Sequence, residues 1–106
     1  MILRGEVYLI DLEPSRGSEI RKVRPCVVVS PDERNTIAAT VIVAPMTTGS
    51  HAYRVRVPVA FQGKRGHIVL DQIRTVARER LIRKVGDVSP TTLKRCLVVL
   101  QEMFAF

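Results

Sequence analysis

Short apolar segments separated by polar ones predict a chain built mainly from β-strands. Some of these segments alternate apolar and polar positions, while 25–30 and 40–46 are continuous β-branched runs too short for a helix. Continuous runs of this length indicate buried strands. Strands are therefore expected at residues 6–12, 25–30, 40–46, 53–59 and 67–73, with 75–77 continuing the last one past a kink.

The polar segments between these strands predict loops and turns. Residues 15–24 have no periodicity and carry several charges, which is typical of an exposed loop. Residues 47–50 and 62–66 predict turns, and residues 32–36 favour a turn or a single helical turn. The charged segment 78–84 fits no element clearly.

The end of the chain carries the clearest helical pattern. Ser89 is a candidate N-cap, and Pro90 follows at the first helical position, where its missing N–H costs nothing. Val98 and Val99 widen the apolar face, which favours cover by a second subunit. The expected buried stripe has spacings of three and four and consists of Leu93, Cys96, Leu97, Leu100 and Phe104.

The order of these elements, with strands first and one helix last, predicts an α+β fold. A chain of 106 residues is one domain, spanning 1–106, and it has no internal repeat or linker. We expect a small, mostly antiparallel β-barrel closed by a C-terminal helix.

Charge adds a prediction about the partner. The chain has 17 Lys and Arg against 10 Asp and Glu, a formal charge of +7. Residues 1–50 carry six basic and six acidic side chains, whereas residues 51–106 carry eleven basic and four acidic ones. The excess therefore lies in the second half and favours a polyanionic partner, either nucleic acid or an acidic protein segment.

The two cysteines, Cys26 and Cys96, predict core positions rather than a disulfide framework. The N-terminus lacks a secretory signal, and no apolar run approaches the roughly 20 residues that span a bilayer. Metal-ligand and cofactor motifs are missing from the sequence, so neither a metal nor a cofactor is expected. We expect a cytoplasmic, reduced protein.

Candidate chemistry concentrates on ionisable and hydroxyl groups beside the predicted strands. If the second and third strands are adjacent, Arg24 and Thr47 come within reach of each other at one edge of the sheet. A guanidinium and a hydroxyl placed in this way can hold a phosphate. From spacing alone, a solvated arginine and a turn-forming threonine remain the alternative.

Several separated motifs resemble the MazF/PemK (Kid) family of bacterial toxins. Their order and spacing fit over essentially the whole chain. The matching pieces are Arg4-Gly5-Glu6-Val7, Asp11-Leu12-Glu13-Pro14, Gly17-Ser18-Glu19, Arg24-Pro25 leading into Val27-Val28-Val29-Ser30, and Asp71-Gln72-Ile73-Arg74-Thr75.

The resemblance implies an SH3-like barrel, a homodimer and a metal-independent endoribonuclease that cuts single-stranded RNA at short sequences. It also implies a cognate acidic antitoxin. The family's catalytic arginine falls on Arg24 and its threonine on Thr47, with Thr48 as a shift by one. The loop glutamate falls on Glu19, and the aspartate that some members use falls on Asp71.

The chain departs from the family pattern at four places. Ile20 and Lys22 replace a glutamine and a glycine that many members have around the loop. Members that rely on a histidine beside the glutamate have it where this chain has Ser18, and Val69 replaces their arginine. These differences favour Arg24 and Thr47 as the catalytic residues and leave Asp71 as a secondary candidate.

Other side chains are candidates for binding RNA. His51 could act as an acid or an RNA contact, although a single histidine on a turn is more often simply solvated. A solvated strand face is the alternative for the basic residues. The candidate RNA-binding residues are Arg21, Lys22, Tyr53, Arg54, Arg56, Lys64 and Arg65, with Arg54 and Arg56 on the outer face of their strand.

Two other classes of function remain open from the sequence. One is a non-enzymatic toxin of similar fold that binds DNA gyrase, as the related CcdB toxins do. The other is a small RNA-binding barrel without activity.

Overall fold

The computed structural model describes residues 1–48 and 54–106 of the chain. Its order of elements confirms the α+β prediction, because the strands lie between residues 6 and 87 and the long helix comes last. The strands are β1 (Glu6–Asp11), β2 (Val23–Val28), β3 (Thr40–Thr48), β4 (Arg56–Phe61), β5 (Lys64–Val69), β6 (Arg74–Ala77) and β7 (Leu81–Asp87). The helices are α1 (Asp32–Ile37) and α2 (Pro90–Met103), with the 3-10 turns η1 (Leu70–Gln72) and η2 (Arg78–Arg80).

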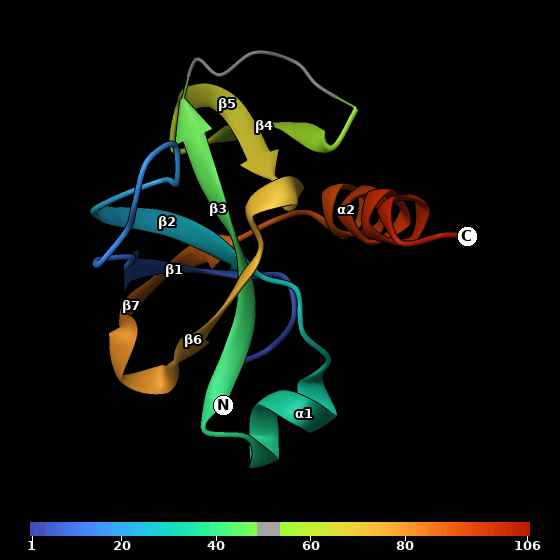
Figure 1. Cartoon of the computed structure of the whole chain (residues 1–106). Coiled ribbons are helices and arrows are strands. Elements are labelled where there is room, and N and C mark those ends of the chain that lie inside the picture. Colours follow the sequence, from blue (N-terminus) through green and yellow to red (C-terminus); the bar gives the residue numbers. More distant parts are fainter. Residues whose placement is uncertain (49–53) are drawn as a thin grey trace.

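The strands pair antiparallel in the order β4-β5-β3-β2-β1-β7, and β6 pairs with the first half of β3. β3 runs the length of the molecule, from α1 at its start to the β4–β5 hairpin at its end (Figure 1). The ends of the sheet approach each other, because Gln62 Nε2 donates to the Val85 carbonyl at 3.3 Å. Complete closure of the SH3-like barrel stays a prediction.

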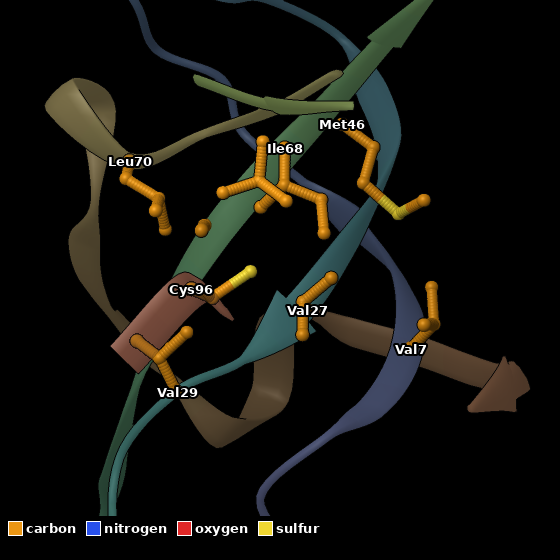
Figure 2. Close-up of a cluster of buried hydrophobic side chains, with 9 residues drawn as sticks. Val7, Val27, Val29, Met46, Ile68, Leu70 and Cys96 are labelled. Atoms are coloured by element: carbon orange, nitrogen blue, oxygen red, sulfur yellow. The ribbon is translucent and has the colours of Figure 1, made fainter. Parts of the chain in front are cut away.

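Two apolar clusters cover opposite faces of the central strands. Val27 lies in the first cluster, whereas its neighbours Cys26 and Val28 lie in the second. Successive residues of a strand point to opposite faces, so a strand covered on both faces must be apolar throughout. This explains the continuous apolar runs. Figure 2 shows members of the first cluster, including Val7, Val27 and Cys96, gathered between the strands and α2.

The C-terminal helix closes the first cluster as predicted, but its buried stripe is shorter. The Ser89 Oγ accepts a hydrogen bond from the Thr92 N–H at 3.1 Å, which confirms the N-cap. Cys96 is fully buried. The assignment of Phe104 to the buried stripe is wrong, because the helix ends at Met103 and Phe104 is 72% exposed. Cover of this helix by a second subunit stays a prediction.

Both cysteines are buried and free, as the sequence predicts. Burial raises the pKa of the Cys26 thiol to about 12 and that of Cys96 to about 11. Thiols with pKa values this high are poor nucleophiles at neutral pH. The two cysteines therefore serve packing rather than chemistry.

Several predicted boundaries are wrong, including the following three. Residues 47–48 belong to β3 rather than to a turn, because they pair with β5. The turn predicted at 62–66 is only two residues long, since Gln62 and Gly63 adopt positive φ and pairing resumes at once. The strand predicted at 67–73 ends at Val69, where the chain enters η1.

The ambiguous segment 78–84 contains η2 and the first part of β7. β7 pairs with β1 at the edge of the sheet, and most of its residues are exposed or half-buried. Edge strands of this kind carry charged side chains, so they lack the apolar pattern that marks a buried strand.

Candidate functional site

Arg24 and Thr47 lie at the same end of two neighbouring strands. Cys26 pairs with Pro45 in the antiparallel β2–β3 ladder, and Arg24 and Thr47 each lie two residues beyond this pair, at the same end of the two strands. The sequence placed Arg24 in a loop and Thr47 in a turn. Both assignments are wrong, because β2 begins at Val23 and β3 continues to Thr48. A rigid sheet therefore positions the pair.

A hollow of about 260 Å³ brings Arg24 and Thr47 together with Lys64 and Thr48. Its polar groups include two cations and two hydroxyls, so it suits a phosphate group with apolar surface beside it. The complete lining is Leu9, Arg24, Pro25, Met46, Thr47, Thr48, Val59, Phe61, Gln62, Lys64 and Gly66.

The Thr47 hydroxyl is the most unusual polar group in this hollow. Its Oγ1 atom is buried and has no hydrogen-bond partner among the residues that the structure describes. Buried hydroxyls normally have a partner, and a lost one costs about 1–3 kcal/mol. An orphaned hydroxyl beside a guanidinium therefore indicates a group held ready for a ligand.

Arg24 is exposed and held by one hydrogen bond. Its Nε donates to the Arg21 carbonyl at 3.2 Å. The two terminal nitrogens have no hydrogen-bond partner in the described part of the chain. This arrangement orients the side chain and leaves the fork of the guanidinium available to an anion.

Gly66 allows β5 to approach the end of β3 closely. A Cβ at this position would lie 1.8 Å from the Thr47 carbonyl oxygen. No side chain fits into that space, so the glycine sets how near β5, which carries Lys64, comes to Thr47 and Thr48.

Glu19 and Asp71 lie in a second hollow, of about 380 Å³, rather than with Arg24 and Thr47. Its lining is Leu12, Glu19, Ile20, Pro45, Asp71, Gln72, Ile73 and Arg74. The two hollows are neighbours along β3, because Pro45 lines one and Thr47 the other. Residues two apart on a strand share a face and are separated by about 7 Å.

Both carboxylates of the second hollow are partly engaged. The Glu19 Oε1 accepts a hydrogen bond from the Arg16 N–H at 2.6 Å, and the Glu19 N–H donates to the Arg16 carbonyl at 3.1 Å. Asp71 forms an ion pair with Arg56 at 3.6 Å. The glutamate thus closes a tight turn within the charged loop, and the aspartate is tied to β4.

The remaining RNA-binding candidates do not form one track. Lys64 lines the hollow of Thr47, Arg65 lies beside His67 on the β4–β5 hairpin, and Arg54 lies against α2 next to Glu102. Arg56 does not lie on an outer face as predicted, because its side chain is only 18% exposed and pairs with Asp71.

The charged loop holds the other two basic candidates. Arg21 and Lys22 are exposed, and Lys22 adopts a positive φ of 67° while its N–H donates to Glu13 Oε1 at 2.9 Å. His51 and Tyr53 lie outside the described residues.

Sequence reasoning assigned no role to Gln72, whose side chain reaches the loop that carries Glu19. Its Oε1 accepts a hydrogen bond from the Ile20 N–H at 2.9 Å. The available signal was its place in the motif 71–75, directly after Asp71. A contact across 52 positions leaves no periodic pattern that could reveal it.

Within residues 1–48 and 54–106, no three metal-ligating side chains gather at one place. None of the helices in the same part is long and apolar enough to cross a membrane.

Comparison with known proteins gives one consistent result. Residues 3–104 match the family model described as the PemK-like, MazF-like toxin of type II toxin–antitoxin systems. The endoribonuclease MazF of Staphylococcus epidermidis is 38% identical over 99 residues, which cover 88% of this chain and 82% of the relative.

Solved structures agree with this match. A mycobacterial endoribonuclease in complex with its cognate antitoxin has a TM-score of 0.81 at 26% identity, with 96% of this chain and 93% of that chain covered. MazF from Deinococcus radiodurans reaches a TM-score of 0.87 at 20% identity, covering 99% and 97% of the two chains. The second likeness shows the fold alone.

Proposed function

The chain belongs to the PemK-like, MazF-like toxins of type II toxin–antitoxin systems, and on that premise we propose how it cuts RNA. It is a MazF-like endoribonuclease toxin. The proposed reaction is metal-independent cleavage of single-stranded RNA at short sequences. The ribose 2′-hydroxyl attacks the adjacent 3′-phosphate, which leaves a 2′,3′-cyclic phosphate and a 5′-hydroxyl.

The observation that carries this proposal is the orphaned Thr47 hydroxyl, which belongs to a residue that lines one hollow together with Arg24. The attack concentrates negative charge on the phosphate oxygens. Arg24 would neutralise that charge with its unpaired terminal nitrogens, and Thr47 would donate a hydrogen bond to one oxygen. Lys64 adds a second positive charge at the edge of the same hollow.

The reaction also needs a proton donor for the 5′ oxygen that leaves and a base that accepts the 2′ proton. Arg24 is a poor base, since guanidinium groups keep their proton up to a pH of about 12. We assign this role to Glu19, whose hollow borders that of Thr47 along β3. Asp71 stays in reserve, because its ion pair with Arg56 favours a structural role.

Partners follow from the family and from charge. The mycobacterial relative was solved in complex with its cognate antitoxin. We propose that an acidic antitoxin segment binds this chain as well and that the net charge of +7 speeds their association. A homodimer acting in the cytoplasm is part of the same proposal.

Incubation of the purified chain with a long single-stranded RNA in EDTA tests the reaction. Discrete fragments that end in a 2′,3′-cyclic phosphate are expected. Arg24→Ala should abolish cleavage, whereas Arg95→Ala removes an exposed arginine from α2 and serves as the matched control. Intact RNA with the unmodified chain would reject the proposed reaction and favour a non-enzymatic toxin. Full activity of Arg24→Ala would reject the site.

A further inference from the structure

The loop between β1 and β2, residues 12–22, is joined to η1 by one side chain. The Gln72 Oε1 accepts a hydrogen bond from the Ile20 N–H at 2.9 Å, and in the described part of the chain the other side chain from outside the loop that bonds to residues 15–22 is Arg24, which donates to the Arg21 carbonyl. The remaining outside bonds come from Arg74 and Arg80 and reach the start of the loop at Leu12 and Glu13. Gln72 is therefore the side chain from outside the loop that bonds directly beside Glu19.

The backbone of η1 is a fixed base for this contact. Leu70 is fully buried, and its N–H donates to the Val55 carbonyl at 3.2 Å. The next residue, Asp71, pairs with Arg56 of β4. Two neighbouring residues thus tie η1 to the core and to β4, so the hydrogen bond that Gln72 accepts from the Ile20 N–H fixes the loop relative to them.

Ile20 connects the fixed η1 turn with the neighbouring residue Glu19. Its side chain packs against the second apolar cluster, and the preceding Glu19 closes a turn with Arg16 through two hydrogen bonds. The two hydrogen bonds hold the turn together, and the contacts of Ile20 attach the turn to the rest of the protein. The hydrogen bond at the Ile20 N–H therefore sets the place of the Glu19 carboxylate.

We infer that Gln72 is a positioning residue, which holds the β1–β2 loop so that Glu19 sits beside the cleavage site. This inference rests on the proposed function, in which Glu19 accepts the 2′ proton. Gln72 itself touches neither the phosphate nor the ribose in this scheme. Its loss should lower kcat more than it changes KM, because the carboxylate is misplaced while the phosphate site of Arg24 and Thr47 remains.

Two substitutions of similar size separate the hydrogen bond from packing. Gln72→Met keeps the length of the side chain but removes the acceptor, and kcat should fall about tenfold or more. Gln72→Glu keeps an acceptor oxygen at the same place and should retain kcat within about threefold. Gln101→Met, on the exposed face of α2, is the matched control and should leave kcat unchanged.

A double substitution tests whether Gln72 acts through Glu19. In Glu19→Gln, which has lost the proposed base, adding Gln72→Met should cost nothing further. An equal loss in both backgrounds would overturn the inference, because it would reveal a general structural role. Activity of Gln72→Met equal to that of the unmodified chain would overturn it as well.

Amide hydrogen exchange at Ile20 tests the geometry without RNA. The Ile20 N–H should be protected in the unmodified chain and in Gln72→Glu, and should exchange faster in Gln72→Met. Equal exchange in all three chains would overturn the inference whatever the enzymatic result. Failure of the unmodified chain to cut RNA rejects the proposed function instead, so the two failures are distinct.

Discussion

At the scale of single residues, Thr47 should be costly for stability and necessary for activity. Its buried Oγ1 has no partner in the described part of the chain, so replacing it with a methyl group removes no hydrogen bond. We expect Thr47→Val to raise the free energy of unfolding by about 1 kcal/mol. RNA cleavage should fall by about 100-fold or more, since one donor to the phosphate is lost.

Urea denaturation and cleavage assays on the same preparations measure both effects. Thr47→Ser keeps the hydroxyl and serves as the control, which should retain most of the activity. A stability loss of about 1 kcal/mol in Thr47→Val would show that the hydroxyl already has a partner in the folded protein. If the hydroxyl serves function rather than stability, Thr47→Val should be more stable and less active than the unmodified chain.

That Arg24 and Thr47 lie at the same end of the sheet could be predicted from the sequence, whereas the place of Glu19 could not. If two consecutive strands are antiparallel neighbours, as β2 and β3 are, the start of one lies beside the end of the next. Glu19 lies on a loop whose course depends on a hydrogen bond to Gln72, 52 positions from Ile20. Such a contact depends on tertiary structure and leaves no local pattern.

At the scale of elements, the close approach of β3 and β5 depends on Gly66. Gly66→Ala would put a methyl group 1.8 Å from the Thr47 carbonyl oxygen, and contact with backbone atoms prevents a small adjustment. We expect a loss of about 3 kcal/mol or more in the free energy of unfolding. Cleavage should fall too, because β5 carries Lys64 to the hollow.

Gly17→Ala is the matched control for this substitution. Gly17 has a φ of +58°, but no atom lies within 4 Å of the place that an added methyl carbon would take, so only backbone strain applies there. That strain costs about 1–2 kcal/mol. Equal urea midpoints for the two variants would show that β5 can move away from β3.

The β1–β7 pair contains a carboxylate that makes stability depend on pH. Burial alone would raise the pKa of Glu6, but hydrogen bonds from Lys84, the Leu3 N–H and Tyr8 outweigh it and lower that pKa. A lowered folded pKa contributes stability above the ordinary value of 4.5, and that stability is lost as pH falls through the folded pKa.

Glu6→Gln should therefore lower the urea midpoint at pH 7, and the difference from the unmodified chain should shrink below a pH of about 4.5. Glu102→Gln removes an exposed carboxylate from α2 and is the matched control. Equal effects of the two substitutions across the pH range would contradict a specific role for Glu6.

The buried elements could be predicted from the sequence, and the edge element could not. Residues 25–30 and 40–46 were recognisable because strands with two covered faces are apolar throughout. β7 has one strand neighbour, and its Arg83 and Lys84 are exposed. Its pairing with β1 is tertiary information, which the local pattern of charges conceals.

At the scale of the whole molecule, much of the positive charge is used to hold the chain together. Three arginines of β6 and η2 donate to backbone carbonyls of distant segments: Arg74 to Leu12, Arg78 to Asn35 and Ala38, and Arg80 to Asp11 and Glu13. Each of these hydrogen bonds ties an arginine side chain to the backbone of a segment that is distant in the sequence. Net charge alone therefore overstates the charge available to RNA.

This division predicts different behaviour for two cations of the basic half. Lys64 is exposed at the hollow of Thr47, so Lys64→Ala should remove one phosphate contact. The slope of log affinity for single-stranded RNA against log salt should become shallower by about 0.7, with little change in stability. Arg78→Ala should leave that slope unchanged but cost about 1–3 kcal/mol, because two carbonyls lose their donor.

Fluorescence anisotropy at several salt concentrations measures the slope. Both substitutions are made in the Thr47→Val chain, so that cleavage of the RNA does not disturb the binding measurement. Urea denaturation of the same chains measures stability. A shallower slope in Arg78→Ala at full stability would show that this arginine contacts RNA instead of capping the loop after α1. Because the two variants lose the same charge, net charge predicts equal effects, whereas the hydrogen bonds of the fold predict that each variant changes only one of the two measurements.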